Sequence, residues 1–426
     1  MRKSMSWGSW AACGAVLSQL ACREVPWPPD GEGGAGGETG DGAAGTAGEG
    51  GSAGAPKIEP VLGCDAEAWP AYASLELLPH PEFADSLGLE TVRAISADGA
   101  VLVGDYRITE FDVFDDIAGR RPIVFRSSAW ELVDEAARGI ATVVNCDGST
   151  IAGRLDDQRA FIKTSGSSLV TITPEGPYWS AEPEDSSADG NRIVGNLRYS
   201  DVTLNRGATN PVVWSASGEP TFWKEWTDLG PPYIDTTEPR SLFHVRFDGL
   251  SFAGGSNICW SGQSCPGPDN LFVSTGPGNE TMYEGAPWSV ASADLTTFSG
   301  WLYNPIFTND LRVVNVFRPP AQNDAIACLD GSCWAVALSS RGNVLLVNFV
   351  TSTEGSAHIW TAQHGFRSLA ALLGLDGINV PLNMRLTAVD MSDDGRVITG
   401  NAFLPNSNGG VERNVFRAYL PLRTYE

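Results

Sequence analysis

From residue 90 onward, short apolar runs are separated by polar turns that share one pattern. Residues 94–104 read AISADGAVLVG, in which an apolar run leads into S-x-D-G and a second apolar run ends at a glycine. The pattern returns at 143–153, 185–195, 244–254, 290–300, 337–347 and 390–400. An aspartate can hydrogen-bond the backbone two residues on, and a glycine tolerates the positive φ of a tight hairpin. Each copy therefore predicts a β-hairpin held at its turn by Asp98, Asp147, Asp189, Asp248, Asp294 or Asp394, with Arg341 in the sixth copy.

Each hairpin is followed by an aromatic-bearing run, a turn and another run, so the repeat unit is four strands long. We name these strands A to D. The copies start 42 to 59 residues apart, and units of that size stack radially as blades of a β-propeller. The chain ends one strand short of a seventh unit, whereas AYASLELLP at 71–79 has the character of a final strand. We expect an all-β fold, a seven-bladed β-propeller closed by this N-terminal strand; a two-sheet sandwich or an open array is the alternative.

The glycine that ends six of the seven copies predicts a bend or a close backbone contact in strand B. The seventh copy, LTAVDMSDDGRVITG followed by NVFRAYL, resembles the HAF-type extracellular repeats of exported bacterial proteins. The resemblance covers roughly residues 90–424. It implies a secreted, propeller-like protein, and the family brings no established activity with it.

The N-terminus has the features of an export signal. Arg2 and Lys3 precede a weakly apolar stretch that ends in QLAC, which resembles a lipoprotein lipobox. We therefore expect residues 1–21 to be a signal peptide and Cys22 to be lipidated. Gln19 departs from the usual lipobox residue, so an ordinary signal peptide without lipid remains an alternative, as does Cys13.

Residues 22–56 are expected to form a flexible tether, because residues 30–56 consist almost entirely of small residues and glycine. Residues 57–426 are then the propeller domain. An anchored chain with Arg23 after the cysteine favours the outer membrane or cell surface, lipid-anchored, with secretion or the periplasm as the alternative.

Charge limits the classes of partner. The chain has 28 basic and 51 acidic residues, a net charge of −23, which repels phosphate backbones and argues against nucleic-acid binding. After the N-terminus no apolar run approaches the length of a membrane-spanning helix, so contact with the membrane is expected only through the lipid anchor. We expect a monomer.

Six cysteines lie beyond Cys22, and an even number in an exported chain predicts disulfides. Two pairs bracket short loops, Cys259 with Cys265 and Cys328 with Cys333. Cys64 and Cys146 are left, and their bridge would pin the N-terminal segment to the folded body. Zinc is the competing interpretation, but no second Cys or His pair lies at ligand spacing near either bracket.

The long connections of the predicted blades, B–C and D–A, fall on one face, which we call the long-loop face. Binding residues often lie on loops held by a rigid scaffold. Most residues just after the strand-B glycine are polar and are expected to rim the central cavity there. The candidate binding residues on this face are Asp105, Arg154, Asn196, Trp223, Trp226, Trp260, Trp301, Asn348 and Asn401. Capping of strand ends and packing of aromatics between blades are the structural alternatives.

Catalysis has little support in the sequence, because neither H-E-x-x-H nor G-x-S-x-G occurs. We assign no catalytic residue, metal or cofactor, and expect a non-catalytic module that binds an envelope protein or polysaccharide through the long-loop face. A carbohydrate-active hydrolase on the same scaffold is the alternative; it requires two carboxylates about 5–10 Å apart in a cleft. Calcium-dependent adhesion through the acidic loops is a third hypothesis.

Overall fold

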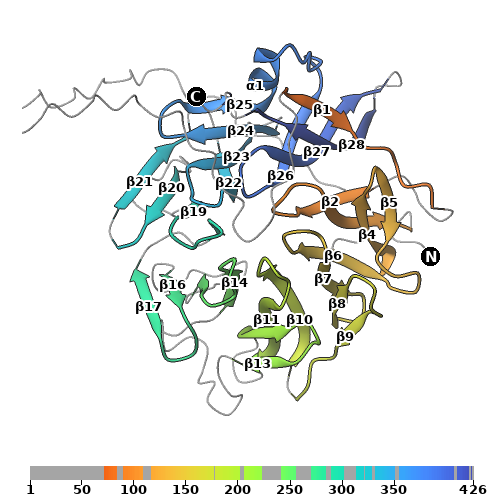
Figure 1. The fold of residues 1–426 in the computed structure, drawn as a ribbon, viewed down its shortest axis with the longest axis vertical. Coiled ribbons are helices and arrows are strands. Elements are labelled where there is room, and N and C mark those ends of the chain that lie inside the picture. The colour runs from red at the N-terminus through yellow and green to blue at the C-terminus, as the bar shows by residue number, and fades with distance from the viewer. Residues whose placement is uncertain are drawn as a thin grey trace, which may run out of the picture. The chain divides into compact units, whose positions relative to one another are not determined.

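The structure is a computed structural model, and its described residues lie within the unit formed by residues 55–426. They are residues 72–83, 90–108, 117–176, 178–201, 206–222, 241–255, 270–284, 289–301, 313–320, 322–328, 332–350, 355–406, 410–421 and 424. These residues form seven antiparallel four-stranded sheets arranged in a ring, which is a seven-bladed β-propeller (Figure 1). The fold predicted from the repeats is confirmed.

The first three blades follow the predicted order from strand A to strand D. Blade 1 contains β2 (Glu90–Ile95), β3 (Leu102–Arg107), β4 (Arg120–Arg126) and β5 (Ala129–Leu132), with the short helix η1 (Ile117–Gly119) before β4. Blade 2 contains β6 (Gly139–Val144), β7 (Thr150–Leu155), β8 (Ala160–Thr164) and β9 (Val170–Ile172). Blade 3 contains β10 (Tyr178–Ser186), β11 (Arg192–Asp201), β12 (Arg206–Ser215) and β13 (Pro220–Phe222).

The next three blades keep this order. Blade 4 contains β14 (Ser241–Val245), β15 (Phe252–Gly255), β16 (Asn270–Ser274) and β17 (Glu280–Glu284). Blade 5 contains β18 (Val290–Ala291), β19 (Phe298–Trp301), β20 (Val313–Arg318) and β21 (Gln322–Ala327). Blade 6 contains β22 (Ser332–Leu338), β23 (Val344–Val350), β24 (Gly355–Thr361) and β25 (Gly365–Ser368), and the helix α1 (Leu369–Leu375) follows it.

Blade 7 joins the two ends of the domain. It combines β26 (Arg385–Met391), β27 (Val397–Pro405) and β28 (Val411–Tyr419) with β1 (Ser74–Leu77), which lies beside β28 (Figure 1). Arg417 on β28 pairs with Glu76 on β1 at 2.8 Å, and the Leu78 amide donates to the Val415 carbonyl. The predicted closure by the N-terminal strand is confirmed.

The repeat turns have the predicted chemistry and one further component. Gly99 and its counterparts have φ near +70°, as in Gly190 at 68° and Gly395 at 76°. The carboxylate of Asp98 accepts from the amide two residues on, at 3.0 Å. The serine two residues before the aspartate was not part of the prediction: Ser96 Oγ donates to Asp98 and accepts from the Val101 amide. Most copies repeat this arrangement, which locks the turn to the first residue of the next strand.

Hydrophobic packing is distributed around the ring. The described residues form seven buried clusters, and each lies at one of the seven interfaces between neighbouring blades. Trp214, for example, packs between blades 2 and 3 with 1% of its surface exposed. Each blade is therefore stabilised mainly by its neighbours, which explains why a propeller needs closure.

A disulfide also joins two neighbouring blades. Cys328 and Cys333 form a disulfide between the last strand of blade 5 and the first strand of blade 6, which confirms this predicted pair and excludes zinc there. Cys146 is disulfide-bonded too, to a partner outside the described residues. The predicted partner, Cys64, and the pair Cys259 and Cys265 also lie outside those residues, as does Cys22. In the described part of the chain, no helix combines the length and hydrophobicity needed to span a membrane.

Candidate functional site

The innermost strand of most blades carries a β-bulge at the same point. In β2, β6, β10, β14, β22 and β26, one residue is skipped in the pairing with strand B. The bulged residues are Arg93, Thr142, Glu184, Phe243, Val336 and Val389. A bulge re-aims a side chain and is frequent next to functional sites. All six line one cavity of about 370 Å³ in the centre of the ring.

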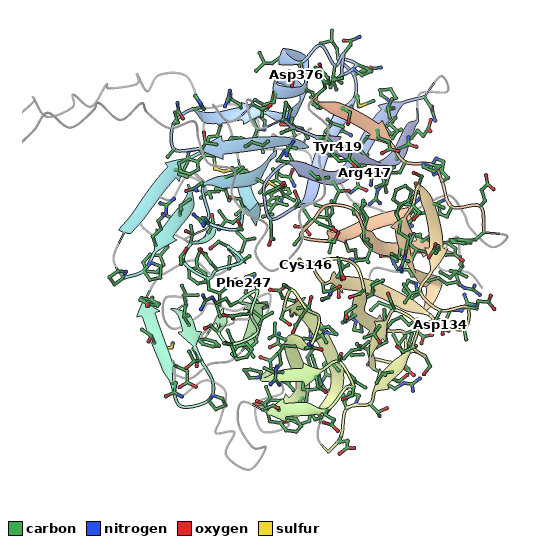
Figure 2. All side chains as sticks on the ribbon, viewed as in Figure 1. Asp134, Cys146, Phe247, Asp376, Arg417 and Tyr419 are labelled. Atoms are coloured by element: carbon green, nitrogen blue, oxygen red, sulfur yellow. A yellow bond between two sulfur atoms is a disulfide. The ribbon has the colours of Figure 1, made fainter. Side chains whose placement is uncertain are left out.

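A ring of backbone hydrogen bonds encloses the cavity near the A–B turns. The Cys146 amide donates to the Ala188 carbonyl, the Ala188 amide to Phe247, and the Phe247 amide to Ala293. The circle continues with the Asp294 amide, which donates to the Ser340 carbonyl, and the Ser340 amide, which donates to Asp393. The Asp393 amide then donates to Ala97, and the Asp98 amide closes the circle by donating to Cys146. Cys146 and Phe247 lie at the inner edge of the ring (Figure 2). Seven links thus join all seven blades around the channel.

Two carboxylates in the cavity come from non-adjacent blades. Asp185 on blade 3 and Asp390 on blade 7 occupy the same repeat position. Each accepts the amide of the next blade's innermost strand at 2.9 Å, Asp185 from Val245 and Asp390 from Ile95. Each also accepts from the amide of the residue that follows it. Burial raises the pKa of Asp185 to about 7 and that of Asp390 to about 6, and the charge of Asp390 adds to the shift at Asp185.

Glu184, the bulged residue beside Asp185, is open to the cavity but deep inside the ring. The residue keeps exposed surface, but the protein atoms of the cavity wall surround its carboxylate and reduce its hydration. This withdrawal from bulk water, followed by the charge of Glu182, raises the pKa of Glu184 to about 8, against an opposing hydrogen bond from Asn196. At neutral pH the Glu184 carboxyl is therefore mostly protonated and can donate a proton.

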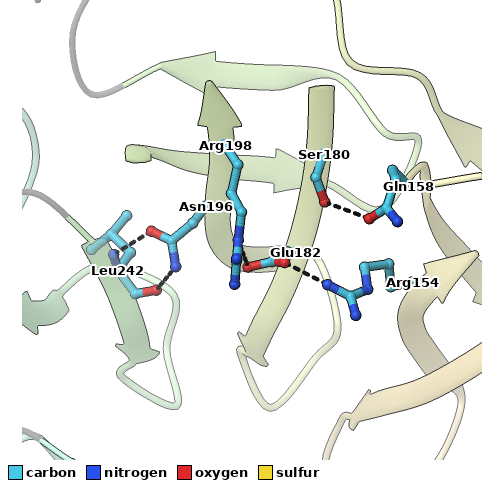
Figure 3. A network of polar contacts seen from close by, with 7 residues as sticks. All are labelled: Arg154, Gln158, Ser180, Glu182, Asn196, Arg198 and Leu242. Atoms are coloured by element: carbon cyan, nitrogen blue, oxygen red, sulfur yellow. Dashed lines mark hydrogen bonds and ion pairs between the residues drawn. The ribbon is translucent and has the colours of Figure 1, made fainter. Parts of the chain in front are cut away.

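Polar contacts link the strands of blades 2, 3 and 4 around Glu182 and Asn196 (Figure 3). Glu182 accepts from Arg154 of blade 2 and Arg198 of blade 3, each at 2.6 Å. The Asn196 amide group pairs with both backbone groups of Leu242 on blade 4, at 3.0 and 3.1 Å. These contacts tie blades 2, 3 and 4 together. They also place Asn196 where it meets Glu184.

The other candidate binding residues make structural contacts or lie outside the described residues. Asp105 is fully buried between Arg93 and Arg120. Asn348 pairs with both backbone groups of Ala388, and Asn401 accepts from Arg413. Trp301 ends β19, and Trp223, Trp226 and Trp260 lie outside the described residues.

None of the described candidates is among the residues that line this cavity. These candidates lie one residue beyond the strand-B glycine and face strand A before its bulge. The cavity is lined by strand A from the bulge onward. The bulge residues share no residue type, so the repeat pattern did not predict them. Their fixed place, three residues before the repeat-serine position, is the signal that identifies them.

Within the described residues, no group of three or more His, Cys, Asp or Glu side chains is placed to hold a metal ion. What the cavity offers is proton transfer and polar recognition. Carboxyl groups with separated pKa values face it from opposite sides, and His244 and Arg93 add nitrogen donors. Pairs of titratable groups held apart in pKa are a hallmark of acid–base sites.

No protein-family model matches the chain, and no curated protein matches it. Solved structures with a similar fold include the β-propeller domain of the trilobed protease from Pyrococcus furiosus, at 9% identity and a TM-score of 0.45, covering 77% of this chain and 95% of that one. Acylaminoacyl peptidase from Pyrococcus horikoshii gives 8% identity and a TM-score of 0.49, covering 80% of this chain and 54% of that one. Oligogalacturonate lyase from Vibrio parahaemolyticus gives 9% identity and a TM-score of 0.47, covering 83% of this chain and all of that one.

At these identities the likeness shows the fold alone. The chain also spans only about half the length of the Pyrococcus horikoshii peptidase. The expectation of a non-catalytic module that binds an envelope protein or polysaccharide is corrected in favour of its alternative, a hydrolase on a propeller scaffold, because carboxyl groups with separated pKa values line the central cavity.

Proposed function

We propose that the chain is a carbohydrate-active hydrolase that cleaves a glycosidic bond in the central cavity. The observation that carries the proposal is the convergence of carboxyl groups from blades 3 and 7 in one cavity. Glycosidases act with two carboxyl groups that flank the bond they cleave. The cavity volume of about 370 Å³ lies within the range of small-molecule sites, and Phe243 and Phe247 offer apolar surface for a sugar ring.

Glu184 and Asp390 take the two roles. Glu184, with the higher pKa, donates a proton to the glycosidic oxygen as its bond to the anomeric carbon breaks. Asp390 accepts a proton from a water molecule whose oxygen bonds to that carbon. Two sugars with free hydroxyl groups leave, and proton exchange with solvent restores both carboxyl groups. Both Asp390 oxygens already accept backbone amides, which favours a base over a nucleophile and hence inversion at the anomeric carbon.

The test is hydrolysis of a panel of 4-nitrophenyl glycosides by the full exported chain. Glu184→Gln is expected to lower kcat by about 10²–10⁴-fold, because it removes the proton donor. Glu219→Gln changes an exposed carboxylate at a turn of the same blade and should leave kcat unchanged. The pH profile should be bell-shaped, falling below about 6 as Asp390 gains a proton and above about 8 as Glu184 loses one. Absence of cleavage across the panel, or wild-type kcat in Glu184→Gln, contradicts the proposal.

We further propose that the chain is an exported HAF-type repeat protein, lipid-anchored through Cys22 at the outer membrane or cell surface. The basic n-region at Arg2 and Lys3, the QLAC motif and the glycine-rich residues 30–56 support this. Metabolic labelling with a tagged fatty acid should mark the wild-type chain and not Cys22→Ala. Equal labelling of both chains would disprove the anchor.

A further inference from the structure

Among the described residues, Arg93 is the one arginine that lines the cavity. It is the bulged residue of blade 1, and Glu184 is the bulged residue of blade 3. Because the bulge turns both side chains toward the channel, the cavity has a guanidinium on one side and the proposed acid on another. The chain is strongly acidic overall, so a cationic group in its central cavity is unusual and indicates an anionic ligand.

An ion pair with Asp105 holds the Arg93 guanidinium in place. Its Nε donates to Asp105 at 2.5 Å, and the second oxygen of Asp105 accepts from Arg120 at 2.6 Å. Asp105 is wholly buried, and Arg93 keeps 32% of its side-chain surface exposed. Asp105 divides one negative charge between two guanidinium groups, so it orients Arg93 without fully neutralising it.

The two terminal amino groups of Arg93 make no hydrogen bond or ion pair with another described residue. In the described part of the chain its single polar partner is Asp105, through Nε. Two parallel N–H donors in a fixed plane match the two oxygens of a carboxylate. Glu184 does not cancel this preference, because its raised pKa keeps it mostly neutral at pH 7. Asp390 on the neighbouring blade 7 already accepts backbone amides at both carboxylate oxygens.

We propose that the substrate is an acidic glycan and that Arg93 binds the carboxylate of a uronic acid residue in the central cavity. This inference rests on the proposed glycoside hydrolysis. Arg93 is the specificity-determining residue, and Asp105 is a positioning residue that acts through it. A neutral sugar would leave the terminal amino groups without an anionic partner, which penalises it relative to the uronate.

Binding and cleavage are measured separately to test this. The hydrolysis-deficient full chain carrying Glu184→Gln is titrated calorimetrically with D-glucuronate, D-galacturonate, D-mannuronate and the methyl ester of each. At least one uronate is expected to bind ten-fold or more tightly than its neutral ester. Adding Arg93→Gln should remove that preference and leave ester affinity within about two-fold. Adding Arg126→Gln instead, which changes an arginine paired with Glu131 on the outer strands of the same blade, should preserve it.

Arg93→Lys provides a second variant in case Arg93→Gln fails to fold, because lysine keeps a positive charge beside Asp105 and lacks the planar fork. It too should lose most of the preference. Equal affinity for every acid and its ester, or full preference in both Arg93 variants, overturns the inference. Cleavage of neutral 4-nitrophenyl glycosides without cleavage of uronides also overturns it, while leaving the proposed hydrolase in place. A preference for uronates with no cleavage of any glycoside supports the inference and rejects the proposed hydrolase.

Discussion

Single glycines in strand B are required by the bulge on the facing strand. Gly195 lies opposite Pro183, beside the bulged Glu184. A Cβ at Gly195 would collide with the carbonyl oxygen of Glu182 and with the ring of Trp214. The same collision with a strand-A carbonyl is found at Gly104, Gly153 and Gly400. The repeat glycine thus reports the path of the inner strand, and through it the direction of the cavity side chains.

Gly195→Ala is therefore expected to lower the free energy of unfolding by about 1–3 kcal/mol, the usual penalty for overpacking a filled core. Gly374→Ala is the matched control, because no atom lies near its added Cβ in α1. It should raise the free energy of unfolding by about 0.5–1 kcal/mol, since alanine favours the helix. Denaturant titration of the two variants checks both signs. An unchanged midpoint in Gly195→Ala would show that the facing strands relax around the methyl group.

Among the elements, the innermost strands are joined by Asp185 and Asp390, whose pKa values make the ring pH-sensitive. Both pKa values are raised in the folded state, to about 7 and about 6, from the ordinary aspartate value of 3.8. The folded chain therefore binds more protons than the unfolded chain between pH 4 and pH 7. Stability from these groups is then highest below the unfolded pKa and falls as pH rises through the folded values.

The expected result is that lowering the pH from 8 to 5.5 raises the Tm of the wild type. Asp390→Asn should weaken this dependence because the group no longer titrates, although it lowers the Tm overall by mismatching the Met391 amide. Asp157→Asn changes an exposed aspartate paired with Arg159 and should keep the wild-type slope. Calorimetric scans at four pH values make the comparison. A slope in Asp390→Asn equal to that of the wild type would rule out its titration as a source.

The strands of each blade were predictable, whereas the bulges were not. Hairpin turns recur with fixed Asp and Gly positions because every turn has the same backbone geometry. The bulge residues range from Arg93 to Val389, since a side chain that faces an open channel has no common packing partner. Asn196 and Asn348 were expected at the cavity rim. They instead satisfy the backbone groups of Leu242 and Ala388 in the next blade, a need that only the assembled ring creates.

In the whole molecule, stability comes from links between blades. A hydrophobic cluster occupies each interface, and the circle of backbone hydrogen bonds around the channel has one bond for each blade. Such a ring is weakest where covalent continuity is missing, which is within blade 7. There β1 pairs with β28 along four residues, and Pro79 accepts from the indole of Trp130 on blade 1. The N-terminal strand therefore joins blades 7 and 1.

A pair of truncations separates the contribution of β1 from everything that precedes it. Deleting residues 1–70 removes Cys64 and the tether but keeps β1, whereas deleting residues 1–79 removes the strand as well. The shorter deletion should unfold cooperatively. The longer one should lose several kcal/mol, because Leu75 and Leu78 leave the clusters at both sides of blade 7 and the edge of β28 is exposed. Denaturation and light scattering compare the two chains. Equal midpoints and no association in the longer deletion would show that the ring stays closed through its inner strands alone.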